Sequence, residues 1–374
     1  MTDATNHARL LYKPADSLYN DESTRRYQGC STIAATKGGR LYLAWYSGGI
    51  CEPHIDNFNL VMYSDDKGDS WKLMLVIPGS REFGIHALDI QLWTAPDGRL
   101  FVYWVQNKAR PAIKGDEPKN SGDEAVWPNQ PRITVDGWIF DDFAHNEWCS
   151  VCDDPDAEEP VFSAPRRVDQ GFLRCKPLVT KTGRWINFNY DQLTDRYGYS
   201  FSDDKGATWE RRYGGKKVDT FFDECMAYQL SDGSIRAFAR CKKGSGELAE
   251  TWSHDDGLTW SDGKLTGIDS PDTRFWVGYT PKGNLLLINN DDREIRKNLT
   301  AYLSLDEGKT WKYKKLIDPR LWVDYPDVDF IGGRAYLTYD RERTGAKEIL
   351  LTSFTDEDLM DDGFSFDIKI VSKA

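Results

Sequence analysis

Six positions of this chain, each about eight to ten residues before a turn glycine, carry side chains suited to binding a charged ligand. They are Gln28 (followed by Gly29 and Cys30), Asp89, Arg174, Glu224, Arg274 and Tyr325. Strands that only pack together would place small or apolar residues at equivalent positions, but five of the six are charged or hydroxylated. Such a ring of polar groups indicates a binding site. Lys176 should face the same way as Arg174, because side chains alternate along a strand.

A second set of polar positions follows the same glycines, about seven residues further along the chain. It comprises Tyr46, Gln106, Tyr190, Arg240, Asn290 and Asp340. These residues end the inner strands or start the next ones, so strand length decides whether they share the site.

The glycines belong to six segments that each read as a strand, a tight turn and a second strand. The turn glycines are Gly39, Gly98, Gly183, Gly233, Gly283 and Gly333. The last four are evenly spaced, whereas the interval between Gly98 and Gly183 is longer. The additional length coincides with residues 107–160, which are rich in Pro, Asp, Glu and Asn. We therefore expect a long excursion from the second unit at about 107–160.

A second repeat, Ser-x-Asp-x-Gly-x-Thr/Ser-Trp, occurs four times, beginning at Ser64, Ser202, Ser253 and Ser304. In such a segment the Asp accepts hydrogen bonds from turn amides, the Gly adopts a positive φ and the Trp packs beneath the turn. The pattern predicts a stapled hairpin and carries no chemistry itself. The last three copies are spaced as propeller blades are.

Together the repeats predict an all-β fold, a six-bladed β-propeller with four antiparallel strands in each blade. We expect residues 1–374 to form one domain, because propellers run long as single domains. The segment Arg9–Tyr12 is expected to pair with Phe366–Val371 and close the ring.

Composition excludes several classes of function. The net charge of −12 argues against nucleic-acid and anionic-membrane partners, which require a basic surface. No apolar run reaches the length of a membrane span, and the N-terminal residues lack the features of a secretion signal. We expect a cytoplasmic protein, or a secreted or periplasmic one whose signal has been removed. Seven cysteines without a disulfide framework favour a reducing compartment.

No metal and no cofactor are expected. Cys149 and Cys152 form one metal-like pair, but a structural zinc site needs four ligands and no second pair follows.

The eight-residue repeats resemble the Asp box, or BNR repeat, of the sialidase (neuraminidase) superfamily. The resemblance covers nearly the whole chain at the level of repeats and is specific at three further places. These are Glu224 followed by Arg240, then Arg296 before the box at Ser304, and finally Tyr325 followed by Asp340. The resemblance implies an exo-acting, retaining glycoside hydrolase, an exo-α-sialidase or a related enzyme, that releases a terminal acidic sugar from a glycan.

The resemblance also implies roles for these residues. Tyr325 would be the nucleophile, and Glu224 would accept its proton, because a phenol is a poor nucleophile at its ordinary pKa near 10. Sialidases are the tyrosine exception among glycosidases. Arg240 and Arg296 would bind the carboxylate of the substrate through forked hydrogen bonds.

The chain departs from the family pattern in its first blade, where sialidases carry an arginine that completes the carboxylate-binding set. Here the equivalent positions are Gln28, Gly29 and Cys30, and Arg26 is out of phase. Additional cations at Arg174, Lys176 and Arg274 would compensate, or would recognise a different acidic sugar. Asp340, which in sialidases braces the missing arginine, would meet Arg341, Arg274 or a sugar hydroxyl.

For the general acid the resemblance indicates a carboxylate on the loop before the first box. Asp56 and Glu52 are the candidates there, with Asp89 as a third, and Asp56 is preferred.

Two other functions are compatible with the same pocket. One is an inverting hydrolase or a lyase acting on a uronate-containing glycan, and the other is a glycan-binding propeller without catalysis. The sequence defines neither the sugar, its linkage and its aglycone, nor the oligomeric state.

Overall fold

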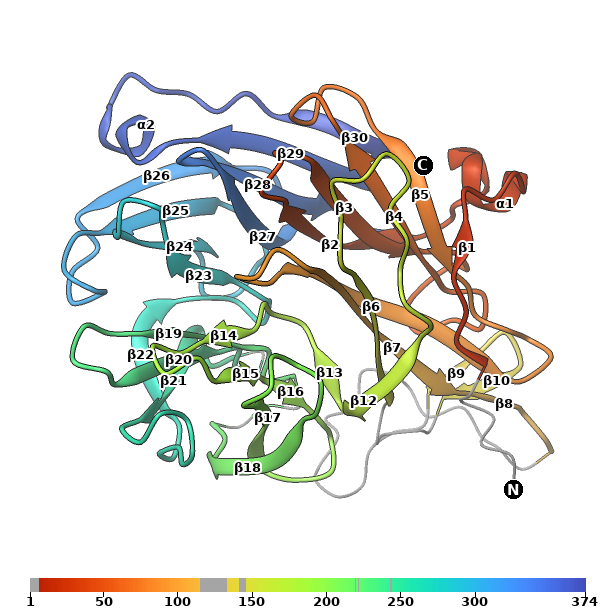
Figure 1. The fold of residues 1–374 in the computed structure, drawn as a ribbon, viewed down its shortest axis with the longest axis horizontal. Helices are drawn as coiled ribbons and strands as arrows, with labels where there is room; N and C mark the ends of the chain where they lie inside the picture. The colour runs from red at the N-terminus through yellow and green to blue at the C-terminus, as the bar shows by residue number, and fades with distance from the viewer. Residues whose placement is uncertain (1–6, 115–132, 141–145, 219, 221, 243) are drawn as a thin grey trace.

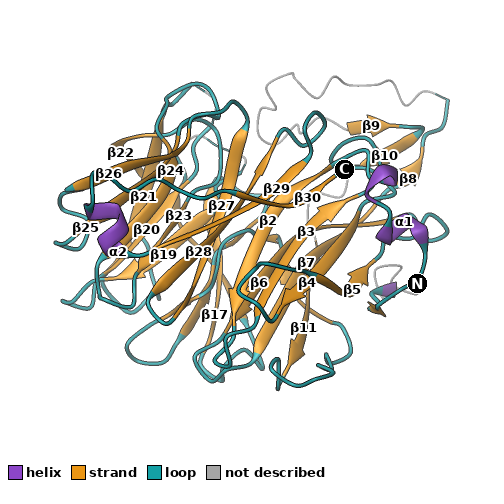
Figure 2. Cartoon of the chain, turned by 90° about the horizontal axis from the view of Figure 1, so that it is seen from above, coloured by secondary structure: helices purple, strands orange, loops and turns teal. Residues whose placement is uncertain are grey.

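The computed structural model describes residues 7–114, 133–140, 146–218, 220, 222–242 and 244–374 (Figure 1). Six small antiparallel sheets are arranged around a central axis. This arrangement confirms the predicted all-β, six-bladed propeller. Figure 2 shows the strands of neighbouring blades lying side by side, with loops at both ends of the sheets.

Blades 1 to 3 contain the first half of the strands. Blade 1 contains β2 (Gln28–Ala35), β3 (Leu41–Ser47), β4 (Phe58–Ser64) and β5 (Lys72–Ile77), with β1 (Leu11–Tyr12) at its outer edge. Blade 2 contains β6 (Ile85–Thr94), β7 (Leu100–Lys108), β11 (Asn146–Cys152) and β12 (Arg166–Gln170). Blade 3 contains β14 (Leu178–Val179), β15 (Trp185–Asn187), β17 (Arg196–Ser202) and β18 (Glu210–Lys216). A separate two-stranded pair is formed by β13 (Phe172–Leu173), which precedes β14 in the chain, and β16 (Asn189–Tyr190), which follows β15.

Blades 4 to 6 follow the chain without interruption. Blade 4 contains β19 (Cys225–Gln229), β20 (Ile235–Ala239), β21 (Glu247–Ser253) and β22 (Lys264–Asp269). Blade 5 contains β23 (Trp276–Tyr279), β24 (Leu285–Asn290), β25 (Leu299–Ser304) and β26 (Tyr313–Asp318). Blade 6 contains β27 (Val323–Ile331), β28 (Arg334–Arg341), β29 (Glu348–Phe354) and β30 (Lys369–Lys373).

Helices are short in the described part of the chain. They are α1 (Ser17–Asn20), the 3₁₀ turn η2 (Glu22–Thr24) and α2 (Asp356–Met360). None of these helices is long and apolar enough to cross a membrane.

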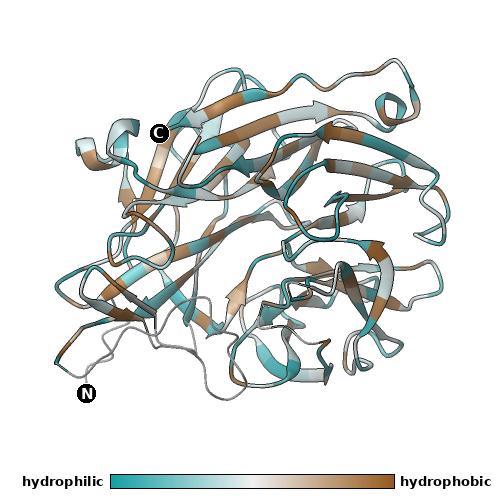
Figure 3. Ribbon diagram, turned by 180° about the vertical axis from the view of Figure 1, so that it is seen from behind, coloured by the Kyte–Doolittle hydropathy of each residue, from teal (hydrophilic) through white to brown (hydrophobic). Residues whose placement is uncertain are grey.

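The core lies within and between the blades, where strands are covered on both faces. The second strand of blade 5 is an example, because the four successive residues 285–288 (Leu-Leu-Leu-Ile) are all fully buried. A strand with neighbours on both faces needs such a continuous apolar run rather than alternation. Figure 3 shows that hydrophobic segments lie mainly on strands and that most loops are hydrophilic.

The four boxes form the predicted hairpin staples. In the third blade, for example, the Gly206 amide donates to Ser202 Oγ at 2.8 Å and the Thr208 amide donates to Asp204 Oδ1 at 2.9 Å. The same two bonds recur in the other three boxes within 0.1 Å. The boxes hold turns and lie on the outer hairpins.

The ring closes differently from the prediction. β1 pairs with β5 of its own blade, with Leu11 opposite Val76, and not with the C-terminal strand. Blades 6 and 1 instead meet through their inner strands, where Asp327 accepts hydrogen bonds from the Thr32 hydroxyl at 2.6 Å and the Ile33 amide at 3.0 Å. A two-residue strand carries too little pattern to specify its partner.

The excursion from blade 2 is shorter than the predicted range of 107–160. Its described part forms a small sheet, β8 (Arg110–Pro111), β9 (Ile133–Val135) and β10 (Trp138–Phe140). Residues 146–152 already form β11, the third strand of blade 2. Part of the predicted segment, 115–132 and 141–145, lies outside the described residues.

Candidate active site

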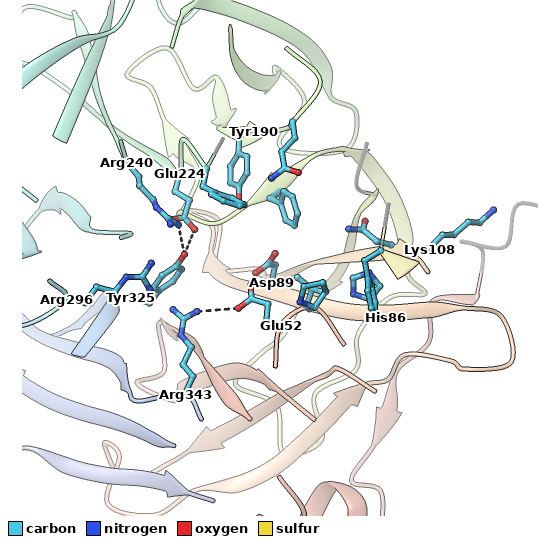
Figure 4. A pocket seen from close by; sticks show the side chains of 17 residues that line it. Glu52, His86, Asp89, Lys108, Tyr190, Glu224, Arg240, Arg296, Tyr325 and Arg343 are labelled. Carbon is cyan, nitrogen blue, oxygen red and sulfur yellow. Dashed lines mark hydrogen bonds and ion pairs between the residues drawn. The ribbon is translucent and has the colours of Figure 1, made fainter. Parts of the chain in front are cut away.

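A cavity of about 300 Å³ opens where the inner strands of several blades begin. Figure 4 shows three arginines, Arg240, Arg296 and Arg343, around Tyr325 on one side, and Glu52 and Asp89 between this group and His86. The cavity therefore has a cationic side, an acidic centre and a further side near β6 and β7.

Three of the inner strands carry the same local distortion at the site. Cys30, Asp89 and Tyr325 have φ values of 56°, 56° and 54°, and each lies where the register of its strand shifts. Positive φ is unfavourable for residues other than glycine, and bulges re-aim side chains. Strain at equivalent positions of blades 1, 2 and 6 indicates that these side chains are placed for a purpose other than packing.

Tyr325, Glu224 and Arg240 form one hydrogen-bonded group. The Tyr325 hydroxyl donates to Glu224 Oε1 at 2.8 Å and accepts from Arg240 at 2.9 Å. The same Arg240 nitrogen donates to Glu224 Oε2 at 3.0 Å. Sequence reasoning predicted all three residues, and the structure brings them together from blades 4 and 6.

Burial changes the acidity of the central phenol. Tyr325 is 6% exposed, and burial followed by the nearby Glu224 carboxylate raises its pKa well above the ordinary value, although Arg240 opposes the rise. The hydroxyl is therefore neutral, and it becomes a nucleophile only as a base removes its proton. Glu224 is in position to do so.

Two further arginines line the cavity beside this group. Arg296 donates to Asp324 at 2.8 Å and to the Asp272 carbonyl oxygen at 2.6 and 3.1 Å. The Arg343 guanidinium lies over the Tyr325 ring, 4.3 Å from its centroid. Arg240, Arg296 and Arg343 are hereafter the arginine cluster.

Arg343 is the main residue that sequence reasoning missed. It reaches from the loop after β28 to the first blade, and a Cβ on Gly29 would lie 2.7 Å from its side chain. Asp340 pairs with Arg343 at 3.3 Å and also accepts from the Cys30 amide. Arg343 therefore occupies the space beside blade 1 where the sequence lacks an arginine, and Gly29 leaves room for it. The signal was the coincidence of a glycine in that register with an arginine three residues after Asp340.

The other predicted cations lie below the cavity rather than in its lining. Arg274 is 1% exposed and donates to four backbone carbonyl oxygens, those of Ser31, Arg174, Tyr325 and Pro326. Arg174 is also 1% exposed and pairs with Asp89 at 3.0 Å. Lys176 donates to the Val328 carbonyl oxygen at 2.6 Å. Their predicted contact with substrate is not supported, because their charges serve to tie the inner strands together.

Gln28 is likewise structural. Its side chain is fully buried, accepts from the Trp45 indole at 3.1 Å and donates to the Lys347 carbonyl oxygen. It joins blade 1 to blade 6 and does not line the cavity.

The structure separates the three candidates for the general acid. Asp56 forms a two-bond ion pair with Arg81, at 2.6 Å for each bond, and lines a different hollow. This position does not support the expected role of Asp56 as the preferred general acid. Glu52 and Asp89 both line the cavity.

These two carboxyl groups differ in acidity. Burial raises the pKa of Asp89 to about 7, and the negative charges of Glu52 and Glu224 add to the rise while Arg174 opposes it. Burial alone would also raise the pKa of Glu52, but Arg343 and a hydrogen bond from Tyr27 bring it below the ordinary value. Near pH 7 Asp89 is therefore partly protonated, whereas Glu52 is ionised.

The remaining wall of the cavity is largely aromatic. Phe172 and Tyr190 stack with centroids 5.0 Å apart, and Phe222 meets Tyr190 edge-on at 6.4 Å. His86 packs edge-on against Phe140 at 4.9 Å, and burial lowers its pKa to about 3, so its imidazole is neutral. Aromatic faces and neutral polar edges of this kind suit the rings and substituents of sugars.

The described residues contain no group of three or more His, Cys, Asp and Glu side chains placed to hold a metal ion. Cys149 and Cys152 are both buried in β11 with free thiols.

Comparisons with known proteins agree with this fold. The BNR repeat-like domain family matches residues 150–333. An anhydrosialidase of Macrobdella decora is 27% identical over an alignment of 179 residues, and the match covers 42% of this chain and 23% of that protein. The chain thus spans about a quarter of the length of this curated relative.

Solved structures extend the likeness to the whole propeller. A Hadza microbial sialidase, Hz136, has a TM-score of 0.67 at 17% identity, covering 91% of this chain and 67% of that one. The intramolecular trans-sialidase of Ruminococcus gnavus has a TM-score of 0.66 at 15% identity, covering 97% of this chain and all of that one. Residues 150–333 are thus similar to the BNR repeat-like domain family, and the solved sialidase structures share the fold of the whole propeller.

Proposed function

We propose that this protein is a retaining, exo-acting glycoside hydrolase that releases a terminal acidic sugar. One observation carries the proposal: the buried Tyr325 hydroxyl donates to Glu224 at 2.8 Å while Arg240 contacts both groups. Purely structural packing does not require a neutral phenol, a carboxylate and a guanidinium at the mouth of a cavity. The relatives named as sialidases support the same class of reaction.

In the first step the Tyr325 oxygen attacks the anomeric carbon as Glu224 takes the phenolic proton. The bond to the aglycone breaks, and Asp89 supplies a proton to the departing oxygen. A glycosyl group on Tyr325 remains. Water then attacks the same carbon, the Asp89 carboxylate takes the proton of the water, and the Tyr325 oxygen leaves and recovers its proton from Glu224.

The arginine cluster supplies the selectivity for an acid. Its three guanidinium groups border one side of the cavity, and guanidinium forks match carboxylate geometry. Because Arg240 lies 2.9 Å from the attacking oxygen, a carboxylate bound there is close to the carbon under attack. This favours a sugar whose carboxylate is on the anomeric carbon, a 2-ulosonic acid, over a uronic acid, whose carboxylate is on the opposite side of the ring oxygen.

Substitution of Tyr325 tests the proposal. Tyr325→Phe should retain the fold and abolish the release of acidic sugar from a panel of sialosides, other ulosonosides and uronosides. Tyr190→Phe is a matched control, since Tyr190 is another buried tyrosine of the cavity that has no assigned part in the bond changes. Full activity of Tyr325→Phe would end the proposal.

The products of the wild-type enzyme identify the reaction. Proton NMR of the first product should show the anomer of the substrate, followed by mutarotation. The opposite anomer would indicate inversion, an unsaturated sugar would indicate a lyase, and an anhydro sugar would indicate intramolecular transfer.

A further inference from the structure

Arg174 is a buried arginine that lies directly after β13, beneath the cavity and outside its lining. Its Nη1 atom lies 3.0 Å from Asp89 Oδ1, and its Nε atom lies 3.7 Å from Glu224 Oε1. Asp89 and Glu224 both line the cavity and come from different blades (Figure 4). One guanidinium group therefore pairs with both carboxyl groups that exchange protons in the proposed mechanism.

The neighbouring Arg274 shows how an arginine with a structural role is held at the same depth. Both side chains are 1% exposed, and the guanidinium groups of Arg174 and Arg274 lie 5.4 and 5.0 Å from the Tyr325 ring centroid. Arg274 donates to four backbone carbonyl oxygens, whereas Nη1 and Nη2 of Arg174 form no hydrogen bond with the described residues. A buried charge needs ionic partners when hydrogen bonds do not stabilise it. Among the described residues, Arg174 forms its ion pairs with the two catalytic carboxyl groups.

Arg174 is also the cation that pairs directly with Asp89. The other charged or titratable groups that face Arg174, Asp89 and Glu224 are Cys30 and Tyr46 of blade 1, Glu52 of the loop after β3, Arg240 of blade 4, Tyr325 of β27, and Arg343 of the loop after β28. Glu52 and Arg343 pair with each other at 3.3 Å. Burial raises the pKa of the Cys30 thiol and of both phenols, so these groups are neutral.

The proposed mechanism, on which this inference rests, moves one proton onto Glu224 and one proton off Asp89 in the same step. Before the step Glu224 is ionised and Asp89 is protonated. After the step Glu224 holds the phenolic proton, and Asp89 is ionised because its proton is on the departing oxygen. The second step reverses both transfers, so the two carboxyl groups carry one negative charge in total throughout.

A fixed cation in contact with both groups suits this exchange, because it stays paired with whichever carboxyl group is ionised and does not have to move. We propose that Arg174 is a positioning residue that allows Asp89 and Glu224 to share one negative charge through both steps of the reaction. Arg174 itself contacts neither the substrate nor the reacting atoms.

The pH profile of the enzyme tests this role. The alkaline limb of kcat/KM reports the protonated general acid, Asp89. Arg174→Gln should move this limb to higher pH by about 1–3 units, because a cation beside an aspartate lowers the pKa of the carboxyl group by about that amount. Arg174→Lys keeps the charge and should restore most of the shift.

Lys176→Gln is the matched control. Lys176 is a largely buried cation two residues further along the same segment, and its ammonium group pairs with Asp329 at 3.1 Å and with neither catalytic carboxyl group. Its loss should leave the alkaline limb in place. The proposal is overturned if Arg174→Gln lowers kcat/KM at every pH without moving the limb, or if Arg174→Lys shifts the limb as far as Arg174→Gln does.

Infrared spectroscopy measures the same proton without turnover. The C=O band of the protonated Asp89 carboxyl group is identified as the band that Asp89→Asn removes. In the resting protein this band should titrate at higher pH in Arg174→Gln. It should titrate at lower pH in Glu224→Gln, because that variant removes the negative charge that competes for Arg174.

The second infrared variant decides the case if Arg174→Gln does not fold. An unchanged titration of Asp89 in Glu224→Gln would show that the two groups share no charge, and it would overturn the proposal. If the wild-type protein releases no acidic sugar from any substrate, the proposed function is contradicted. The infrared titrations would then still decide whether Arg174 couples the two carboxyl groups.

Discussion

At the scale of single residues, the site contains side chains at equivalent positions of the repeats and one side chain that lies outside the repeat pattern. Tyr325 and Glu224 occupy equivalent positions of two blades, and the Tyr325 hydroxyl lies 2.8 Å from Glu224 Oε1. Arg343 comes from a loop outside this register and reaches the site over Gly29. The arginine cluster therefore retains three members although blade 1 contributes none of them.

Arg343 should act on the binding of the carboxylate. Arg343→Gln should lower kcat/KM for the acidic substrate by about 10- to 150-fold, equivalent to about 1.5–3 kcal/mol for a hydrogen bond to a charged group. Arg343→Lys should recover part of this loss. Arg341→Gln is the control, because Arg341 pairs with Glu348 at 3.0 Å and does not line the cavity. Equal losses in the Arg341 and Arg343 variants would contradict the assignment.

Asp89 should set the alkaline limit of activity. Its pKa is raised to about 7, and a general acid works in its protonated form, so kcat/KM should fall as the pH rises through about 7. Asp89→Asn should remove this alkaline limb of the pH profile. It should also lower the rate of hydrolysis of substrates with poor leaving groups by about 10²–10⁴-fold, with little effect on activated aryl glycosides.

The matched variant is Glu52→Gln, which removes the ionised neighbour. The alkaline limb should remain and move to lower pH, because the Glu52 charge contributes to the raised pKa of Asp89. A limb that persists in Asp89→Asn and disappears in Glu52→Gln would assign the proton donor to Glu52 instead.

At the scale of the elements, the blades supply rigid strands, and local irregularities aim the side chains. The inner strands of blades 1, 2 and 6 each contain a residue with positive φ at a register shift. The outer hairpins are held by the boxes, whose glycines fit closely against hydrophobic side chains. Gly206, for example, lies against Trp185 of its own blade.

Two glycines with the same φ separate backbone strain from packing. Gly206 and Gly283 both have φ of 81°, but a Cβ on Gly206 would lie 2.9 Å from the Trp185 ring, whereas a Cβ on Gly283 would meet nothing within 4 Å. Gly283→Ala should lower the free energy of unfolding by about 1–2 kcal/mol through the left-handed conformation alone. Gly206→Ala should cost about 1–3 kcal/mol more through overpacking. Urea unfolding measures both, and equal values would show that the box is not packed as described.

At the scale of the whole molecule, the ring is closed by buried polar contacts rather than by strand exchange. Asp327 of blade 6 accepts from Thr32 and Ile33 of blade 1 and from Gln91 of blade 2, at 2.6, 3.0 and 3.3 Å. It is 2% exposed. These bonds lie beneath the cavity and fix the distance between the blades that form it.

Asp327→Ala should therefore lower the free energy of unfolding by about 2–4 kcal/mol, because it leaves buried donors without an acceptor. Asp362→Ala, at an exposed position of the same blade's outer connection, should change it by less than about 0.5 kcal/mol. Guanidinium unfolding followed by tryptophan fluorescence measures both. Similar stabilities of the two variants would contradict closure through Asp327.

The sequence predicted those parts of the molecule that repeat. The spacing of turn glycines such as Gly183 and Gly233 predicted six blades, and it aligned Glu224 and Tyr325 because both head inner strands. Arg343 was missed because a loop residue has no fixed register. Asp56 was preferred over Asp89 because its loop precedes the first box in the chain. That proximity does not show which way the loop folds. The pairing of β1 was wrong because two residues carry little pairing information.

The central claim is that Tyr325 becomes glycosylated. The most direct measurement is mass spectrometry of the protein after incubation with a 3-fluoro glycosyl fluoride of the acidic sugar that the wild-type enzyme releases, a reagent that slows the second step. We expect a covalent adduct on the peptide that contains Tyr325, and none in Tyr325→Phe. Enzyme that turns over substrate but gives no adduct, or gives one on Glu224, Glu52 or Asp89, would contradict the account.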